Sequence, residues 1–157
     1  MSENSALLVE KNGHWLTLWF NRPESRNALS DEMVSELTQA LNTARLDPTI
    51  RGITLRGKGG TFCAGGDLKA FGRLTSGDRS LAEVSEFSVS AGHLFRLIES
   101  MPQVVVALVE GAAMAGGLGI VCAADLVAVT QDAKFALTET MIGIPPAQIA
   151  PIVVDRI

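Results

Sequence analysis

The chain has 157 residues, of which 47% are hydrophobic and 19% charged, and its formal net charge is −4. This length and composition predict one folded domain and exclude an intrinsically disordered chain. The acidic balance, the absence of tyrosine and the lack of a basic stripe argue against nucleic acid as the main partner.

Cysteine usage and the length of the apolar runs bear on where the protein works. Cys63 and Cys122 are two well-separated thiols, which predict neither a disulfide framework nor a metal site and favour a reducing compartment. The first residues carry Glu3 and no basic region, so they do not look like a signal peptide. The longest apolar stretch, residues 111–124, is shorter than the roughly 20 residues that cross a bilayer. We therefore expect a cytoplasmic protein that makes no membrane contact.

Hydrophobic spacing predicts strands that alternate with helices. In chain order we expect a hairpin over 7–20 with its turn at Asn12-Gly13, a helix over 31–46 capped by Ser30, a strand over 51–57, a helix over 81–100, a strand over 104–109, a helix-length apolar segment after the 115–119 glycine cluster, a strand over 126–129, a short strand over 134–136, and a turn or helix from Thr138. The runs at 104–109 and 126–129 are continuously apolar, which predicts strands buried on both faces. The alternation indicates an α/β fold.

The last residues predict an interrupted element. An amphipathic helix begins within residues 147–157 and stops at Ile157 without a C-cap or a polar tail. This ending predicts a truncated or cleaved chain.

Two glycine-rich stretches make unusual demands on the backbone. In TFCAGGDLK (61–69) and AGGLGIVCA (115–123), a loop of small residues leads into an expected helix, where free backbone N–H groups lie at the positive end of the helix dipole. Two such N–H groups aimed at one point would form an oxyanion hole. Close packing is the simpler explanation of either stretch alone, whereas two of them in one domain favour function. A dinucleotide-binding fingerprint fits poorly, because Cys122 stands where its last glycine belongs.

Glu139 is the strongest acid–base candidate, because its neighbours in the sequence are apolar. These neighbours are Phe135, Leu137, Met141 and Ile142. Burial among them would raise the pKa of the carboxyl and suit it to general acid–base work near neutral pH. The alternative is an acid in the first turn of a helix, stabilised by the helix dipole and capped by Thr138.

The remaining ionisable candidates have simpler structural explanations. Glu110 lies at the end of a strand, and Asp67 is expected to cap backbone N–H groups of its own loop. His14 and His93 have no partners at triad or metal-ligand spacing, so we expect them on the surface of the hairpin and of a helix.

Four motifs identify a resemblance that covers essentially the whole chain from Leu7 to Ile157. NRPESRNAL, TFCAGGDLK, VEGAAMAGGLGIVCAADLVAV and FALTETMIGIPP resemble, in order and spacing, the crotonase (enoyl-CoA hydratase/isomerase) superfamily. The resemblance implies a crotonase-like N-terminal core domain over residues 1–157, built as a spiral of ββα units that form two nearly perpendicular sheets. It also implies a lyase of fatty-acid metabolism that binds acyl-CoA thioesters and assembles as a homotrimer or a dimer of trimers. No metal and no cofactor are implied, apart from the coenzyme A carried by the substrate.

Site residues follow from the resemblance position by position. Gly66 and Gly116 match the two backbone donors that stabilise a thioester enolate, and Glu139 matches a catalytic acid of the family. Two aimed amides would each contribute on the order of 3 kcal/mol to such an enolate. Coenzyme A is expected against Arg26, Asn27, Ala28, Ala64, Gly65, Gly66, Asp67 and Leu68.

Gly119 departs from the family pattern. Ordinary hydratases of the family hold water between two glutamates, and the position of the first glutamate is Gly119 in this sequence. A single acid must then carry the proton. The segment 142–157 resembles hydratases of branched substrates, 3-methylglutaconyl- or isohexenylglutaconyl-CoA, in leucine and acyclic terpenoid breakdown, and we favour that reaction. The alternative is a Δ3,Δ2-enoyl-CoA isomerase, which shuttles a proton with one acid.

A third interpretation is a non-catalytic fragment or interaction module. The family needs roughly another hundred residues, whose helices close the acyl-CoA pocket and bury the trimer contact. If this chain is complete, apolar faces of the last helix are exposed and activity is not expected.

Overall fold

The computed structural model describes residues 5–66 and 80–157 of the chain. Its elements are β1 (Leu7–Asn12), β2 (Trp15–Phe20), the 3-10 turn η1 (Pro23–Ser25), α1 (Asp31–Leu46), β3 (Gly52–Gly57), α3 (Leu81–Glu99), β4 (Val104–Val109), β5 (Ala112–Met114), α4 (Gly116–Ala123), β6 (Leu126–Val129), β7 (Lys134–Ala136), the 3-10 turn η2 (Thr138–Ile142) and α5 (Ala150–Arg156).

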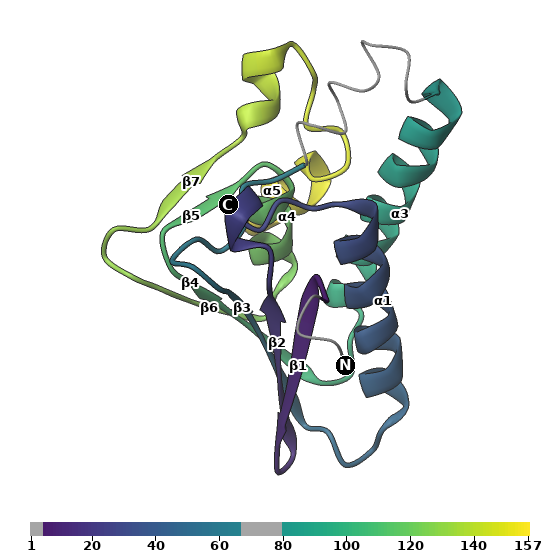
Figure 1. Ribbon diagram of the computed structural model, residues 1–157, viewed down its shortest axis with the longest axis vertical. Helices are drawn as coiled ribbons and strands as arrows, with labels where there is room; N and C mark the ends of the chain where they lie inside the picture. Colours follow the sequence, from purple (N-terminus) through teal and green to yellow (C-terminus); the bar gives the residue numbers. More distant parts are fainter. Residues whose placement is uncertain (1–4, 67–79) are drawn as a thin grey trace.

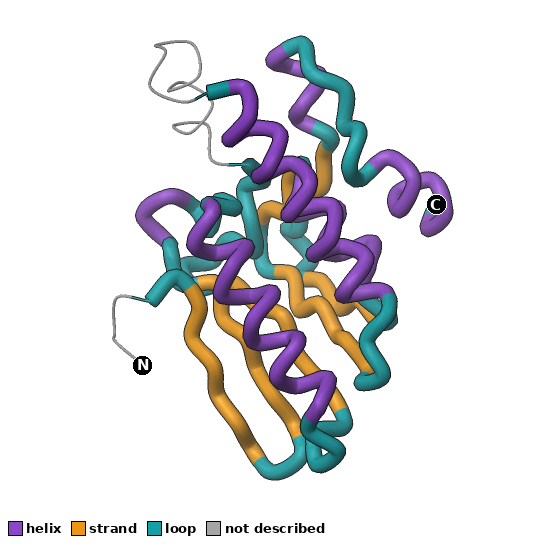
Figure 2. The backbone as a smooth tube through the Cα atoms, turned by 90° about the vertical axis from the view of Figure 1, so that its right-hand side faces the viewer, coloured by secondary structure: helices purple, strands orange, loops and turns teal. Residues whose placement is uncertain are grey.

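Five strands form the main sheet in the order β1-β2-β3-β4-β6, and β5 pairs with β7 in a second sheet. All neighbouring strands are parallel except the β1–β2 hairpin. The helices α1 and α3 cover one face of the main sheet, to its right in Figure 1 and in front of it in Figure 2. The predicted α/β class is therefore confirmed.

A ββα unit repeats along the chain. β4 belongs to the main sheet, β5 to the second sheet, and α4 follows them. The next unit repeats this order with β6, β7 and then η2 and α5. Cys63, which follows β3, makes an isolated parallel bridge to Ala113 of β5 and so extends the second sheet by one residue. The repeat matches the predicted spiral of ββα units.

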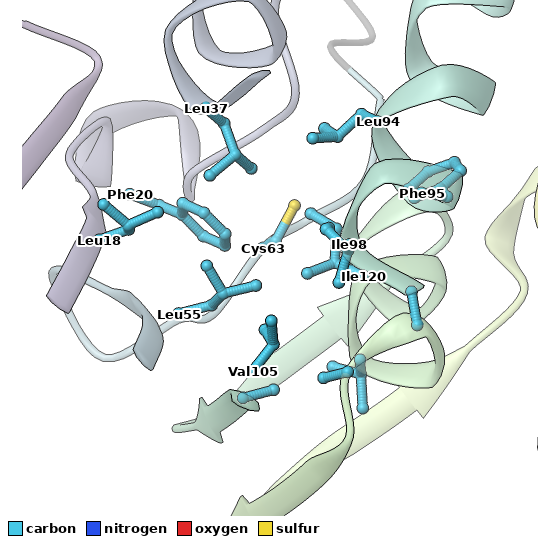
Figure 3. Packing of buried hydrophobic residues seen from close by; sticks show 14 of the residues in the cluster. Leu18, Phe20, Leu37, Leu55, Cys63, Leu94, Phe95, Ile98, Val105 and Ile120 are labelled. Carbon is cyan, nitrogen blue, oxygen red and sulfur yellow. The ribbon is translucent and has the colours of Figure 1, made fainter. Parts of the chain in front are cut away.

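The core lies between the main sheet and the helices. Figure 3 shows its side chains, among them the buried Leu18, Phe20, Leu37, Leu55, Leu94, Phe95, Ile98, Val105 and Ile120, with the sulfur of Cys63 in their midst. The capping predicted for α1 is present, because the Ser30 side chain accepts a hydrogen bond from the Met33 amide. The long, strongly periodic helices and the strands beside them begin and end within about one residue of the prediction.

The predicted position of the hairpin turn and the predicted burial of β6 and β4 on both faces are wrong. The hairpin pairs Asn12 with Trp15, so its two-residue turn is Gly13-His14, one position later than expected. Gly13 supplies the positive φ of +58° that such a turn needs at its first position. β6 is not buried on both faces, because it lies at the sheet edge and all four of its residues are exposed. β4 is buried on one face only, because buried residues such as Val105 alternate along the strand with exposed and half-buried residues on the other face.

Candidate functional site

The carboxyl ends of β5 and β7 bring two parts of the candidate site to one edge of the second sheet. These strands are parallel, so both end at the same side. β5 leads through Ala115 into α4, whose first residue is Gly116. β7 leads into η2, which carries Glu139. A hydrogen bond from the Ala115 amide to the Ala136 carbonyl (2.8 Å) extends the pairing to this edge.

The loop that contains Gly66 is joined to β5 by the backbone. The Cys63 amide donates to the Ala112 carbonyl (3.0 Å), and the Met114 amide donates to the Cys63 carbonyl (2.9 Å). Gly65 has a φ of +90°, and a Cβ placed on it would lie 2.6 Å from the Ala115 Cβ. Only glycine fits this close approach. The two glycine stretches singled out in the sequence therefore lie side by side.

The direction of the Gly66 N–H follows from the carbonyl on the same peptide. The Gly65 carbonyl accepts a hydrogen bond from the Leu29 amide (2.7 Å). Because the carbonyl and the N–H of a trans peptide point to opposite sides, the Gly66 N–H points away from Leu29. This peptide is held by its carbonyl, and its donor is turned outward.

Gly116 is presented in the same manner at the start of α4. The Ala115 carbonyl accepts from the Gly119 amide (3.1 Å), so it points along the helix, and the Gly116 N–H on the same peptide points out of the helix N-terminus. Ala115 adopts φ 49° and ψ −122°, a strained conformation for alanine. Such strain at the entrance of a helix marks a functional candidate.

The Glu139 carboxylate is partly buried. In the part of the chain that the structure describes, its Oε2 atom is shielded from solvent and has no hydrogen-bond partner. A buried polar atom without a partner is uncommon and calls for an explanation such as a catalytic role. The expected apolar surroundings are only partly present, because Phe135 and Met141 are 43% and 82% exposed.

Gly119 lies in α4 where the structure leaves no room for a side chain. A Cβ on Gly119 would overlap Cγ2 of Ile149 and lie 3.1 Å from the Ile149 Cβ and 3.2 Å from Cε1 of Phe95. Ile149 is 2% exposed and precedes α5. An apolar wall therefore lies beside position 119, where the family resemblance implies a glutamate in ordinary hydratases.

The residues expected to contact coenzyme A differ in exposure. Arg26 is exposed, whereas Asn27 and Ala28 are buried. The Ala64 amide donates to the Arg26 carbonyl (3.0 Å), which joins the first loop to the Gly66 loop. Asp67 and Leu68 lie outside the described residues.

Cys63 has a role at the site that the sequence did not reveal. Its thiol is buried and accepts a hydrogen bond from the Gly65 amide (3.4 Å). Burial raises the pKa of this thiol to about 12, so the group is neutral. A Cβ on Gly117 would lie 2.9 Å from the Cys63 Cβ, so the cysteine also packs against α4. In the sequence, only the small residues on its C-terminal side gave a hint of this packing.

Glu110, the weaker acid–base candidate, is part of an ion pair. Arg56 donates two hydrogen bonds to its carboxylate, at 2.8 and 3.1 Å. These hydrogen bonds lower the pKa of Glu110, which is the opposite of what a general acid needs. The Arg56 guanidinium also lies 4.7 Å from the Trp19 ring centroid. The pair is a structural feature of the open face of the sheet.

The two histidines are exposed, as predicted. The His14 ring bonds the Thr49 carbonyl through Nδ1 (2.7 Å). His93 borders a groove of about 740 Å³ between α1 and α3, together with Asp31 and Glu86. The residues that line this groove include none of the candidate site residues named above.

The described residues, 5–66 and 80–157, offer neither a membrane-spanning helix nor a metal-binding cluster. No helix there is long and apolar enough to cross a membrane. No group of three or more His, Cys, Asp or Glu residues there is placed to hold a metal ion.

Known proteins resemble this chain in sequence and structure. The family model described as enoyl-CoA hydratase/isomerase matches residues 10–157. Enoyl-CoA hydratase EchA19 of Mycobacterium tuberculosis is 38% identical over 141 residues, which are 88% of this chain and 52% of that protein. The structure of Pseudomonas aeruginosa AtuE superposes with a TM-score of 0.91 and 43% identity, covering 97% of this chain and 58% of AtuE. The human mitochondrial methylglutaconyl-CoA hydratase is a more distant relative, 31% identical over 140 residues, or 88% of this chain and 40% of that enzyme.

The chain thus spans little more than half the length of these bacterial proteins. The match nevertheless extends over nearly all of its own residues, and the ββα repeat agrees with it. The chain belongs to the enoyl-CoA hydratase/isomerase family, the crotonase superfamily.

Proposed function

We propose that the whole protein adds water to a branched 2-enoyl-CoA and that this chain carries the oxyanion hole and the proton carrier. The observation that supports this most is the pair of outward-turned peptides at Gly66 and Gly116, in adjacent loops joined by backbone hydrogen bonds. Each peptide is held by its carbonyl, so its N–H needs no reorganisation to meet a developing negative charge. Preorganised donors of this kind contribute several kcal/mol to the stabilisation of an enolate.

The reaction can be followed atom by atom. Glu139 takes a proton from water, and the water oxygen bonds to C3 of the substrate. The electron pair of the C2=C3 bond moves toward the thioester, whose oxygen becomes negative and accepts hydrogen bonds from the Gly66 and Gly116 amides. Glu139 then returns the proton to C2. One carboxylate thus serves as base and then as acid, which suits a buried, unpartnered oxygen.

The branched substrate is the finer part of the proposal. It is supported by the likeness of the segment 142–157 to hydratases of 3-methylglutaconyl- and isohexenylglutaconyl-CoA, and by the methylglutaconyl-CoA hydratase among the more distant relatives. Coenzyme A is assigned to the surface formed by the two joined loops, with Arg26 exposed beside Ala64. We assign Asp67 and Leu68 to the same surface from the sequence alone.

Isomerisation of a 3-enoyl-CoA is the second candidate, and one observation favours it. Ile149 and Phe95 wall off the Gly119 position, so this side of the site offers no polar partner to a water molecule. An isomerase needs no water, because Glu139 takes a proton from C2 and returns it to C4 while the double bond moves into conjugation with the thioester.

One assay separates the two reactions. The full-length protein is incubated with 3-methylglutaconyl-CoA and, separately, with a 3-enoyl-CoA, and the absorbance of the conjugated thioester is followed. Hydration removes this absorbance from the first substrate. An increase in this absorbance with the 3-enoyl-CoA, without any decrease with 3-methylglutaconyl-CoA, would reject hydration in favour of isomerisation.

The proton carrier is tested with Glu139→Gln, which keeps the shape and removes the base. We expect either activity to fall by about 10² to 10⁴. Glu99→Gln, at the exposed end of α3, is the matched control and should keep full activity. Wild-type rates in Glu139→Gln would show that another group carries the proton.

The third interpretation, a non-catalytic module, is tested by calorimetry with the 157-residue chain and a saturated acyl-CoA. Binding of this ligand, with no change in absorbance when the same chain is given either enoyl-CoA substrate, would support it. For the whole protein we propose a homotrimer or a dimer of trimers, which would cover exposed apolar residues such as Leu126 and Val154. Light scattering of the full-length protein checks the subunit number.

A further inference from the structure

Asn27 is the buried residue that joins the two loops of the candidate site. Its side chain is 0% exposed, and its φ of 56° lies in the left-handed region that asparagine tolerates better than most residues. Both amide hydrogens are used, because Nδ2 donates to the carbonyls of Lys58 (2.8 Å) and Thr61 (2.7 Å). The amide oxygen accepts from the Arg22 backbone N–H (2.9 Å). No other side-chain type offers two donors and an acceptor at this reach from the backbone.

These bonds continue into the segment that carries the proposed donor. Two residues after Asn27, the Leu29 amide holds the Gly65 carbonyl (2.7 Å), and the carbonyl of Arg26 holds the Ala64 amide (3.0 Å). The side chain of Asn27 therefore fixes residues 58 and 61, while the backbone on either side of it fixes residues 64 and 65. The direction of the Gly66 N–H depends on the last of these bonds.

We propose that Asn27 is a positioning residue, which acts through the loop at residues 58–65 to aim the Gly66 N–H, and not a contact of coenzyme A. This inference rests on the proposed function, in which Gly66 donates to a thioester oxygen. The side chain has no exposed surface with which to touch a ligand. Removal of its donors leaves two buried carbonyls without partners, and the loop is then expected to shift.

The test uses two variants of Asn27. Asn27→Asp keeps the size but replaces the two N–H donors with a carboxylate facing two carbonyls. Asn27→Gly keeps the left-handed backbone and removes the whole side chain, so it covers the case in which the buried charge prevents folding. The matched control is Asn21→Asp in the same loop, because Asn21 donates to the Ser5 carbonyl (3.0 Å) and not to the loop at 58–65.

The readout is the thioester carbonyl of bound butyryl-CoA, which has no double bond to hydrate or move. Isotope-edited Raman difference spectra of the full-length protein report how strongly hydrogen bonds polarise this carbonyl. We expect a downshift on binding to the wild type and to Asn21→Asp. Both Asn27 variants should bind butyryl-CoA with little change in affinity but lose most of the downshift. In nuclear magnetic resonance spectra of the free protein, the Gly66 amide peak should move.

Each of the other outcomes rejects either the positioning role of Asn27 or the proposed function. A full downshift in Asn27→Gly would reject the positioning role and leave the proposed function standing. Weaker binding with a normal downshift would make Asn27 a coenzyme contact, which also rejects the proposal. If butyryl-CoA shows no downshift on the wild type, the proposed function fails, and an unmoved Gly66 peak in Asn27→Gly then rejects the positioning role independently.

Discussion

Gly119→Ala tests whether the wall beside α4 is as closed as the structure indicates. The added methyl would overlap Cγ2 of Ile149 and lie 3.2 Å from Cε1 of Phe95. Ile149 is buried and branched at Cβ, so the obstructing methyl cannot swing away by a change at the end of the chain. We therefore expect the segment before α5 to be pushed from its place.

The expected cost is the difference between two terms. Overpacking of a tight core costs about 1–3 kcal/mol, and an overlap with a β-branched group belongs at the upper end. Alanine in place of glycine inside a helix stabilises the folded state by about 1 kcal/mol. The free energy of unfolding should fall by about 2 kcal/mol, which is roughly 4–8 °C in melting temperature for a chain of this size.

Urea denaturation of the single and double variants gives the measurement. In an Ile149→Ala background the obstructing methyl is gone, and Gly119→Ala should become neutral or stabilise by up to about 1 kcal/mol. Ile149→Val keeps the branch at Cβ, so the full cost should remain in that background. Gly92→Ala in α3, where an added Cβ meets nothing within 4 Å, should stabilise. If Gly119→Ala is as stable as Gly92→Ala, Ile149 does not close this side of the site.

Three further predictions concern burial and charge. The folded-state pKa of Cys63 lies above its ordinary value of 9.0, so the stability that its neutral thiol confers is complete below pH 9.0 and declines as the pH rises toward about 12. The free energy of unfolding of the wild type, measured against pH, should fall relative to that of Cys63→Ser only in this range. A thiol reagent should label Cys122 long before Cys63. The pKa of Glu110 is lowered, so its ion pair stabilises the fold above its ordinary value of 4.5 and this contribution is lost as the pH falls through the lower folded value. Glu110→Gln should therefore cost about 1 kcal/mol or less at neutral pH, and the two unfolding curves should converge in acid. Leu126→Ala at the exposed sheet edge should cost about 0.5 kcal/mol or less, whereas Leu55→Ala in the core should cost about 2–5 kcal/mol, and equal costs would contradict the exposure of β6.

Local sequence patterns predicted where helices and strands lie more accurately than they predicted how deeply those elements are buried. The helix over 31–46 carries its own evidence, because the apolar period, the cap at Ser30 and the acids of the first turn all lie within the segment. β6 has a sequence as apolar as that of a buried strand, yet its burial depends on which elements lie beside it. The apolar run at 126–129 contains no information about which elements lie beside it.

In the candidate site, too, features that depend on neighbouring residues could be predicted and features that depend on distant residues could not. The glycines at 65–66 and 116–117 could be recognised because each places a demand on its own backbone. The hydrogen bonds of the Asn27 side chain could not be predicted, since its partners Lys58 and Thr61 are 31 and 34 residues away in the sequence. Its place in a family motif suggested a ligand contact, and the structure puts its side chain inside the protein.

The arrangement of the ββα repeat explains how one fold can support several reactions. The peptides of the two proposed donors are fixed by backbone hydrogen bonds, from the Leu29 amide to the Gly65 carbonyl and from the Gly119 amide to the Ala115 carbonyl, so their direction depends little on side chains facing the substrate. In the proposed function, the positions that decide the proton chemistry lie elsewhere, namely position 119 within α4 and Glu139 in η2. Because the bonds that orient the donors are made by the backbone, a change of side chain at either place does not remove them. If the proposed function holds, a closed wall at Gly119 in place of a carboxylate alters how water and protons are handled, while the stabilisation of the enolate by the two amides is retained.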